Sequence, residues 1–238
     1  MNALPVRSCN GFATGEMKRF FSSGPSIAFE TLYREVNRQA LAPFFKSCMD
    51  VNGRVLDAGC GWGDLASHLN LNHPCGIDVA FEQLQQGRHV GAIGPCAQSD
   101  LSHLPFENET FDTTICANVL HYTGFSGLEE LYRVTKTNGR LLLAFLERSE
   151  YTRRSIDLAI TLGLFPPFMR EVPLFDISDF HRLGVSIEDS VTVIGLPPWF
   201  VVSRKVQRRG LVVYVLRKRP VRPRVTHCYT ELMPTAAV

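Results

Sequence analysis

Apolar positions follow two different patterns along this chain. One is the three- to four-residue recurrence typical of helices, and the other is the short continuous run typical of buried strands. Apolar side chains recur every three or four residues in two segments, which predicts helices over residues 27–45 and 125–134, and a further helix is expected over residues 82–89 after the second strand. Short apolar runs bounded by turn residues predict strands over residues 54–57, 75–78, 95–98, 111–116 and 140–146. Because strands and helices alternate, we expect crossover connections and a mostly parallel sheet with helices on both faces.

The pattern changes after residue 147. Residues 151–190 combine short helical pieces with Pro166 and Pro167, which is typical of an insertion. Two β-rich runs, 191–203 and 211–217, are expected to close the sheet. We therefore divide the chain into an N-terminal arm with a lid helix (1–50), a cofactor-binding core (51–147), an inserted cap over the ligand site (148–190), closing strands of the same domain (191–219) and a basic tail that we expect to be disordered (220–238).

The composition argues against a disordered, a membrane-spanning and a zinc-binding protein. The 238 residues are 45% hydrophobic and carry a formal net charge of +2, so the chain is too apolar to be disordered and only weakly basic. Its longest apolar runs fall short of the roughly 18 residues that a membrane-spanning helix needs. The seven cysteines form no C-x-x-C pair and have no histidine at a zinc-ligand spacing. We therefore expect a cytoplasmic protein with reduced thiols, no metal, no membrane insertion and no nucleic-acid partner.

A glycine-rich loop follows the first expected strand. From Asp57 to Gly63 the sequence reads D-A-G-C-G-W-G, and an expected helix begins at Asp64. Glycines let the backbone approach a ligand closely, and a helix N-terminus offers free N–H groups. Asp78 stands about 20 residues after the loop's start, at the end of the next strand, where a carboxylate can accept hydrogen bonds from a ribose diol. This combination predicts a nucleotide-like ligand.

The acidic residues in and beside the loop indicate which kind of nucleotide-like ligand binds there. A dinucleotide fingerprint needs a small residue three positions after Gly61, where this chain has Asp64. Asp57 also puts a carboxylate where a pyrophosphate would lie, and negative charge there repels a diphosphate and attracts a cation. S-adenosyl-L-methionine (SAM) has a sulfonium, an ammonium and a ribose diol but no phosphate. It therefore fits the loop better than a dinucleotide does.

Further short stretches follow the loop in a fixed order. After V-L-D-A-G-C-G-W-G at 55–63 come Ile77 with Asp78, then Ser99, Asp100 and Leu101, then residues 104–106, 111–112, 117–121 and 133–141. Together, over residues 54–147, they resemble the motifs of class I SAM-dependent methyltransferases. The resemblance is greatest to the ubiquinone/menaquinone-biosynthesis type and its small-molecule relatives.

The resemblance implies a fold, a cofactor and an activity. The fold is α/β and Rossmann-like: a seven-stranded, mostly parallel sheet with the last strand antiparallel, helices on both faces and a helical or loop cap. The cofactor is SAM, and the activity is methyl transfer. The residues implied in cofactor binding are Asp57, Gly59, Gly61, Gly63, Asp78, Val79, Asp100, Leu101 and Asn118.

Two candidate catalytic residues, His121 and Tyr122, follow the fourth strand. Ligands of open α/β sheets bind at the carboxyl ends of the strands, which places both residues near the expected site. His121 is then a general base or orients the acceptor, but a base is needed only if the acceptor must lose a proton. The alternative is that His121 only packs or caps, and the sequence leaves both interpretations open.

Large apolar side chains in the lid helix and the cap indicate the kind of acceptor. We expect Tyr33, Phe165, Phe168 and Trp199 to line its site. A cavity of this kind favours a hydrophobic or aromatic small molecule, such as a natural product, a quinone-like or a lipid-like compound. Two alternatives stay open: an RNA methyltransferase that uses the basic tail, and a SAM-binding protein that catalyses a non-methylating step such as a cyclisation. The oligomeric state and the acceptor atom are not predicted.

Overall fold

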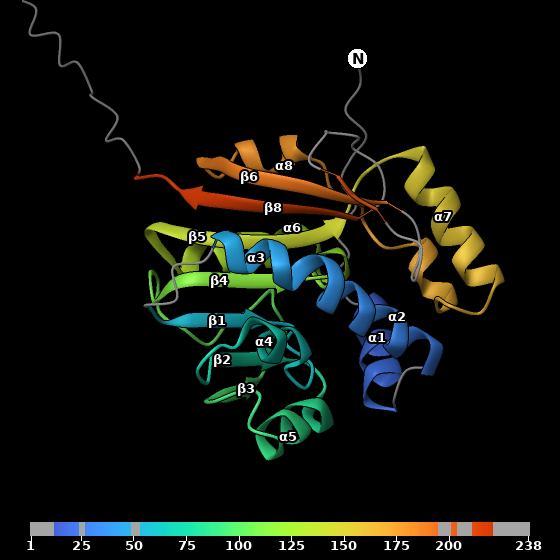
Figure 1. Cartoon of the computed structure of the whole chain (residues 1–238), viewed down its shortest axis with the longest axis horizontal. Helices are drawn as coiled ribbons and strands as arrows, with labels where there is room; N and C mark the ends of the chain where they lie inside the picture. Colours follow the sequence, from blue (N-terminus) through green and yellow to red (C-terminus); the bar gives the residue numbers. More distant parts are fainter. Residues whose placement is uncertain (1–11, 24–26, 49–52, 195–200, 204–210, 221–238) are drawn as a thin grey trace, which may run out of the picture.

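The centre of the molecule is a single eight-stranded sheet (Figure 1). In this computed structural model, residues 12–23, 27–48, 53–194, 201–203 and 211–220 are described. The strands are β1 (Val55–Ala58), β2 (Cys75–Asp78), β3 (Cys96–Gln98), β4 (Phe111–Ala117), β5 (Thr135–Leu146), β6 (Val185–Ile194), β7 (Val201–Ser203) and β8 (Leu211–Lys218). They lie in the order β3-β2-β1-β4-β5-β8-β6-β7.

The sheet topology confirms the expected fold class. Strands β1 to β5 pair in parallel, and β8, the last strand, is antiparallel to both of its neighbours, β5 and β6. Two details differ from the sequence prediction. The three-residue strand β7 adds an eighth strand at the edge of the sheet. Strand β6 begins at Val185 and not near residue 191, because Val185 already pairs with Lys218 of β8.

Helices surround the sheet and its carboxyl edge. They are α1 (Phe12–Ser22), α2 (Ile27–Val36), the π-helical turn η1 (Asn37–Leu41), α3 (Ala42–Cys48), α4 (Asp64–Leu69), α5 (Phe81–His89), α6 (Leu120–Val134), α7 (Glu150–Thr161), the 3-10 turn η2 (Pro167–Arg170) and α8 (Ile177–His181). Three predicted helical segments are confirmed, as α2 to α3, α5 and α6. Helix α1 was not predicted. Within the described residues, no helix combines the length and apolarity needed to cross a membrane.

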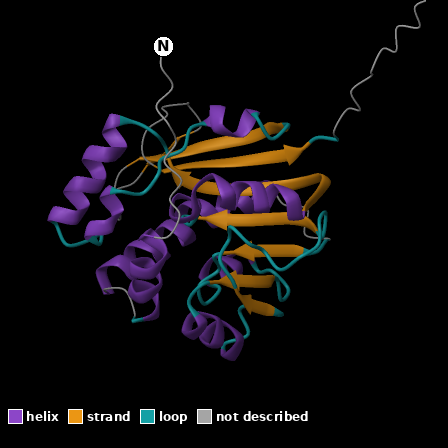
Figure 2. Cartoon of the chain, turned by 180° about the vertical axis from the view of Figure 1, so that it is seen from behind, coloured by secondary structure: helices purple, strands orange, loops and turns teal. Residues whose placement is uncertain are grey.

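Alternating side chains of the central strands are buried on opposite faces of the sheet. On β5, Leu142 and Ala144 pack with η1, α3 and α4, whereas Leu141, Leu143 and Phe145 pack with α6 and α8. Figures 1 and 2 show helices covering the sheet from either side. Burial on both faces explains why these strands read as continuous apolar runs in the sequence.

Helices α1, α2 and α7 gather at one end of the sheet, beyond the carboxyl end of β5 (Figure 1). Helix α7 begins directly after β5, and its Arg153 donates hydrogen bonds to the carbonyl oxygens of Arg170 (2.8 Å) and Val172 (2.9 Å). These bonds fix the segment around η2 against α7. The end of the sheet is therefore surrounded by two helices that precede the sheet in the sequence and by one that follows β5.

The turn from β1 into α4 depends on a glycine at Gly63. This residue precedes α4 with φ of 86°, in the left-handed region, and a Cβ there would lie 2.8 Å from the Cβ of Ala92 and 2.9 Å from Ile93 Cγ2. The glycine therefore allows both the reversal of the chain and close packing against the segment after α5.

We expect Gly63→Ala to lower the free energy of unfolding more than Gly91→Ala does. Gly91 also has positive φ, at 72°, but a Cβ there meets no atom within 4 Å, so its substitution carries only the backbone cost of about 1–2 kcal/mol. The Gly63 substitution adds an overpacking cost of about 1–3 kcal/mol. Urea unfolding of both variants measures the difference, and equal losses would show that the neighbouring segment shifts freely.

Candidate functional site

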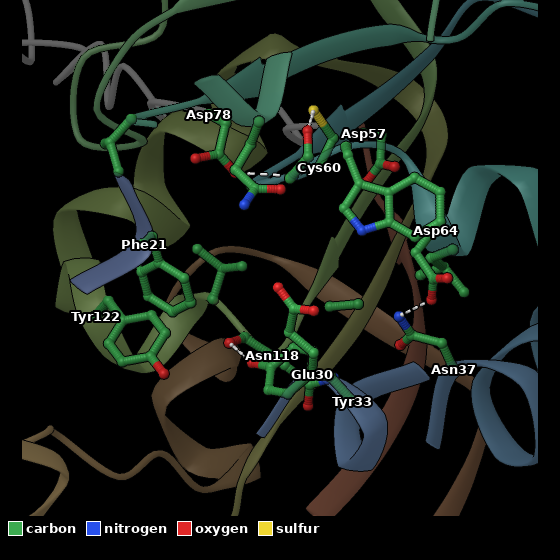
Figure 3. A pocket seen from close by; sticks show the side chains of 18 of the residues that line it. Phe21, Glu30, Tyr33, Asn37, Asp57, Cys60, Asp64, Asp78, Asn118 and Tyr122 are labelled. Carbon is green, nitrogen blue, oxygen red and sulfur yellow. Dashed lines mark hydrogen bonds between the residues drawn. The ribbon is translucent and has the colours of Figure 1, made fainter. Parts of the chain in front are cut away.

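A single pocket joins the carboxyl ends of β1, β2 and β4 to helices α1 and α2. It contains about 1040 Å³ of empty space, part of it open to solvent. Figure 3 shows its two sides: acidic groups from the strand ends, and aromatic rings and polar groups from the helices.

The floor of the pocket is the glycine loop. The N–H of Gly61 donates a 2.8 Å hydrogen bond to Asp78 Oδ2, which ties the loop to the end of β2. A Cβ added at Gly61 would meet only Gln83 Oε1, at 3.9 Å. The floor there is bare backbone, so a ligand can approach it closely.

Asp78 lies at the end of β2 with its carboxylate at the pocket (Figure 3). Besides the bond from Gly61, its Oδ1 accepts a 2.8 Å hydrogen bond from the N–H of Ala80. Burial raises the pKa of this carboxyl, and the backbone N–H donors act in the opposite direction. A carboxylate has about four lone-pair sites, so both oxygens can accept a further hydrogen bond.

Asp57 is a buried carboxyl directly beneath the pocket, with 3% of its surface exposed. Its Oδ2 has no hydrogen-bond partner among the described residues. Burial, together with the nearby charges of Asp78 and Asp64, raises the pKa of Asp57 to about 7. A cation bound beside it would both satisfy the free oxygen and stabilise its charged form.

The π-helical turn η1 brings Asn37 into the pocket wall. Its Nδ2 donates a 2.9 Å hydrogen bond to Asp64 Oδ2 at the start of α4, and its Oδ1 is buried without a partner among the described residues. Isolated π-helical turns occur frequently at functional sites. Asn37 and Asp57 therefore both leave a buried acceptor atom in the same pocket.

Helix α2 closes the pocket with Tyr33. The hydroxyl of Tyr33 donates a 2.7 Å hydrogen bond to the carbonyl oxygen of Asn118, just beyond β4. Its ring stacks on Phe29, with 5.0 Å between the ring centroids and 26° between the planes. Burial, followed by the proximity of Tyr122, raises the pKa of Tyr33, so the phenol keeps its proton near neutral pH.

Tyr122 extends the aromatic wall beside Tyr33. Its ring meets that of Phe21 edge to face at 5.7 Å, and its hydroxyl donates to Met169 Sδ at 3.4 Å. Burial raises the pKa of Tyr122 as well. Behind these rings lie Phe165, 6.0 Å from the Phe29 ring, and Phe168, 6.2 Å from the Tyr122 ring.

His121 does not line the pocket. It is 2% exposed, and neither ring nitrogen has a hydrogen-bond partner among the described residues. Burial lowers the pKa of His121 to about 3, so the ring is neutral near pH 7. A general base must reach the proton that it removes. The packing interpretation therefore agrees better with this position than the catalytic one does.

The pocket brings together most of the residues proposed from the sequence. Those that line it are Tyr33, Asp57, Gly59, Gly61, Asp78, Val79, Leu101, Asn118 and Tyr122. Gly63 instead shapes the start of α4, and Asp100 accepts hydrogen bonds of 2.8 Å from the N–H and the hydroxyl of Ser102. Phe165 and Phe168 lie one layer behind the wall, and Trp199 lies outside the described residues.

Several lining residues were not singled out from the sequence. They include Met17, Phe21, Glu30, Arg34 and Asn37, all on α1, α2 or η1. The spacing of Met17 and Phe21, four residues apart, is a helical signal that could have revealed α1. For the polar residues there was no such signal, because periodicity identifies an apolar face and not a polar group directed at a ligand. Among the described residues, no group of three or more His, Cys, Asp or Glu side chains could hold a metal ion.

Comparisons with known proteins identify the family. A family described as a methyltransferase domain matches residues 56–143. Malonyl-(acyl-carrier protein) O-methyltransferase of Erwinia billingiae is 32% identical over 126 residues, which cover 48% of this chain and 49% of that protein. Ubiquinone/menaquinone biosynthesis C-methyltransferase UbiE of Geotalea daltonii is 31% identical over 110 residues, which cover 39% of this chain and 45% of that protein.

The matching segments span between 41% and 67% of the length of three curated relatives. Among solved structures, magnesium protoporphyrin IX methyltransferase of Synechocystis with bound SAM has a TM-score of 0.58 at 15% identity, covering 92% of this chain and all of that one. At this identity the structural likeness shows the fold alone. With the matching domain and the curated relatives, it confirms the resemblance noted in the sequence: residues 56–143 of this chain form a methyltransferase domain of the class I SAM-dependent type.

Proposed function

We propose that this protein transfers the methyl group of SAM to a small apolar or aromatic acceptor by in-line displacement. The observation that carries the proposal is the two-sided pocket. Carboxylates at the ends of β1 and β2 lie on one side, and aromatic rings of α1, α2 and α6 lie on the other. A cofactor on the acidic side would face an apolar acceptor on the aromatic side.

The acidic side fits the groups of SAM. Both oxygens of Asp78 can accept hydrogen bonds from the ribose diol, while the bare backbone at Gly61 leaves room beside it. Leu101 offers an apolar contact for the adenine ring. Val79, between Asp78 and the aromatic wall, contributes a second apolar surface.

The unpaired acceptors of the pocket fit the ammonium of the methionine part. Asp57 Oδ2 and Asn37 Oδ1 are buried and without partners among the described residues, and such groups are normally hydrogen-bonded in a folded protein. Near pH 7 Asp57 is poised between its two protonation states. A cationic ligand favours the charged state, because opposite charges attract strongly where solvent is scarce.

The residues of the wall position the reactants and exclude water. When bound, SAM supplies an activated methyl group, so the protein mainly has to hold the acceptor in line with it. Tyr33 fixes α2 to the end of β4 through Asn118, and the rings of Phe21 and Tyr122 close the pocket beside it. Both tyrosines keep their protons near neutral pH, and because each hydroxyl already donates, to Asn118 and to Met169, its oxygen can still accept a hydrogen bond from the acceptor.

The relatives support a small-molecule acceptor. Two of them are a malonyl-(acyl-carrier protein) O-methyltransferase and a ubiquinone/menaquinone biosynthesis C-methyltransferase, and the structural neighbour is a magnesium protoporphyrin IX methyltransferase. An aromatic wall with a few polar groups is typical of such sites. A nucleic-acid acceptor would instead need a basic surface beside the site, and among the lining residues Arg34 is the one basic side chain.

We expect Asp78→Asn to weaken SAM binding by about 10–100-fold, because hydrogen bonds to a charged acceptor contribute about 1.5–3 kcal/mol each. Calorimetric titration with SAM measures the change. Asp112→Asn is the matched control, since Asp112 pairs with Lys136 at the start of β4, away from the pocket. Unchanged affinity in a folded Asp78→Asn protein would contradict the assignment of the ribose to this residue.

We expect SAM affinity to rise with pH up to about 7, by at most tenfold per unit, and then to level off as Asp57 becomes fully charged.

In the ligand-free protein the contribution of Asp57 to folding stability changes with pH in the opposite direction. The pKa of Asp57 is higher in the folded than in the unfolded chain, so its contribution to stability falls as pH rises from about 4 to about 7. Asp57→Asn should weaken both dependences and leave the contribution of Asp78, whose pKa burial also raises, and titrations and urea unfolding at several pH values measure them. A pH profile that this substitution leaves unchanged would exclude Asp57 as its source.

We expect methyl transfer to aromatic and polyketide-like small molecules and none to bulk RNA. Release of S-adenosyl-L-homocysteine with each acceptor measures the activity at physiological salt. Methylation of RNA that weakens steeply with salt, with the small molecules inert, would indicate an RNA methyltransferase instead. Cofactor binding without methyl transfer to any acceptor, but with conversion of a substrate, would indicate a non-methylating enzyme.

A further inference from the structure

Glu30 places a free carboxylate in the wall of the pocket. It belongs to α2, and Figure 3 shows its carboxylate pointing into the space between the acidic side and the aromatic side. No hydrogen bond or ion pair joins its side chain to any other residue in the described part of the chain. A charged group left open towards a cavity is available to a ligand.

The nearest basic residue along the helix does not neutralise Glu30. Arg34 follows one helical turn later, but its guanidinium lies over the ring of Trp62, 5.0 Å from the ring centroid. That cation–π contact holds Arg34 towards the glycine loop. The charge of Glu30 therefore remains directed into the pocket.

Aromatic rings line the pocket on the same side as Glu30. Phe29 and Tyr33 flank it on α2 and stack on each other, and Phe21 and Tyr122 extend the wall. Ring faces attract cations through their negative quadrupole, and carboxylates attract them directly. A carboxylate among aromatic rings is a combination that recognises an ammonium group on an apolar skeleton.

The overall charge of the pocket points to the same ligand. Its lining contains four carboxyl groups, Glu30, Asp57, Asp64 and Asp78, and one guanidinium, that of Arg34. SAM carries one net positive charge and would be held on the side of Asp57 and Asp78. It therefore leaves an excess of negative charge on the side of Glu30, which a neutral or anionic acceptor would not balance.

We infer that the acceptor carries a cationic amino group on an apolar or aromatic skeleton, and that Glu30 recognises this group. The inference rests on the proposed function, since it assigns the cofactor to the opposite side of the pocket. It makes Glu30 a specificity-determining residue. The aromatic wall binds the skeleton, and the carboxylate selects amines over neutral molecules of the same shape.

The test compares amines with alcohols of the same skeleton: benzylamine, 2-phenylethylamine and tryptamine against benzyl alcohol, 2-phenylethanol and tryptophol. Binding to protein saturated with S-adenosyl-L-homocysteine is measured by calorimetry for the wild type, Glu30→Gln and Glu35→Gln. Glu35 lies on the same helix outside the pocket and pairs with Arg38, so its substitution is a matched control for the loss of charge.

We expect at least one amine to bind the wild type about 10–100-fold more tightly than its alcohol, as a charge-assisted hydrogen bond predicts. Glu30→Gln should abolish this preference, and Glu35→Gln should keep it. Equal binding of amines and alcohols, or binding of neither at millimolar concentration, would overturn the inference. A loss of S-adenosyl-L-homocysteine affinity of more than tenfold in Glu30→Gln would instead assign Glu30 to the cofactor. If the wild type does not bind S-adenosyl-L-homocysteine at all, the proposed function itself fails, and the two failures are thus distinguished.

Discussion

The concentration of negative charge at the ends of β1 and β2 is the constraint on which the rest of the site depends. Neighbouring parallel strands end at one edge, so Asp57 and Asp78 are brought together where solvent is scarce. The cost of burying negative charge is reduced differently at each carboxyl. Asp78 accepts hydrogen bonds from two backbone N–H groups, whereas the pKa of Asp57 is raised, so this carboxyl retains its proton to higher pH. A bound cation would relieve both, so ligand binding and folding stability are thermodynamically linked.

The aromatic side of the pocket is built from segments that lie far apart in the sequence, and together they close an apolar cavity. Helices α1 and α2 precede the sheet, and η2 follows β5, yet their rings form one continuous cluster. Phe20 meets both Phe29, at 5.4 Å, and Phe168, at 5.7 Å, and Phe21 meets Tyr122. Aromatic rings suit this task because each buries a large area at a modest cost in rotamer entropy. The wall is held together by edge-to-face contacts more than by hydrogen bonds.

The sequence allowed prediction of the sheet and of the acidic side of the site, but not of the helical side. Asp78 and the glycine loop follow buried strands whose apolar runs are visible in the sequence, and parallel pairing then determines where they meet. Glu30 and Asn37 belong to a helix whose orientation is set by tertiary packing, which no local pattern encodes. His121 illustrates the limit most clearly. Its position after β4 was correctly located, but whether the ring faced the pocket or the core depended on one turn of α6, which is broken at Gly124.

Helices α2 and α3 are joined by the π-helical turn η1. This turn determines how the pocket-lining side of α2 is rotated relative to the side of α3 that packs on the sheet. The N–H of Ala42 donates to the carbonyl oxygen of Asn37, five residues earlier, so this turn contains one residue more than an α-helical turn. Each residue rotates an α-helix by about 100°, so removing one residue here would turn α2 by that angle relative to α3. Phe44 and Phe45 of α3 would keep their places against the sheet while the pocket wall rotated away. A single codon gained or lost at this turn is thus a route by which ligand preference could change in evolution while the folded core stays intact.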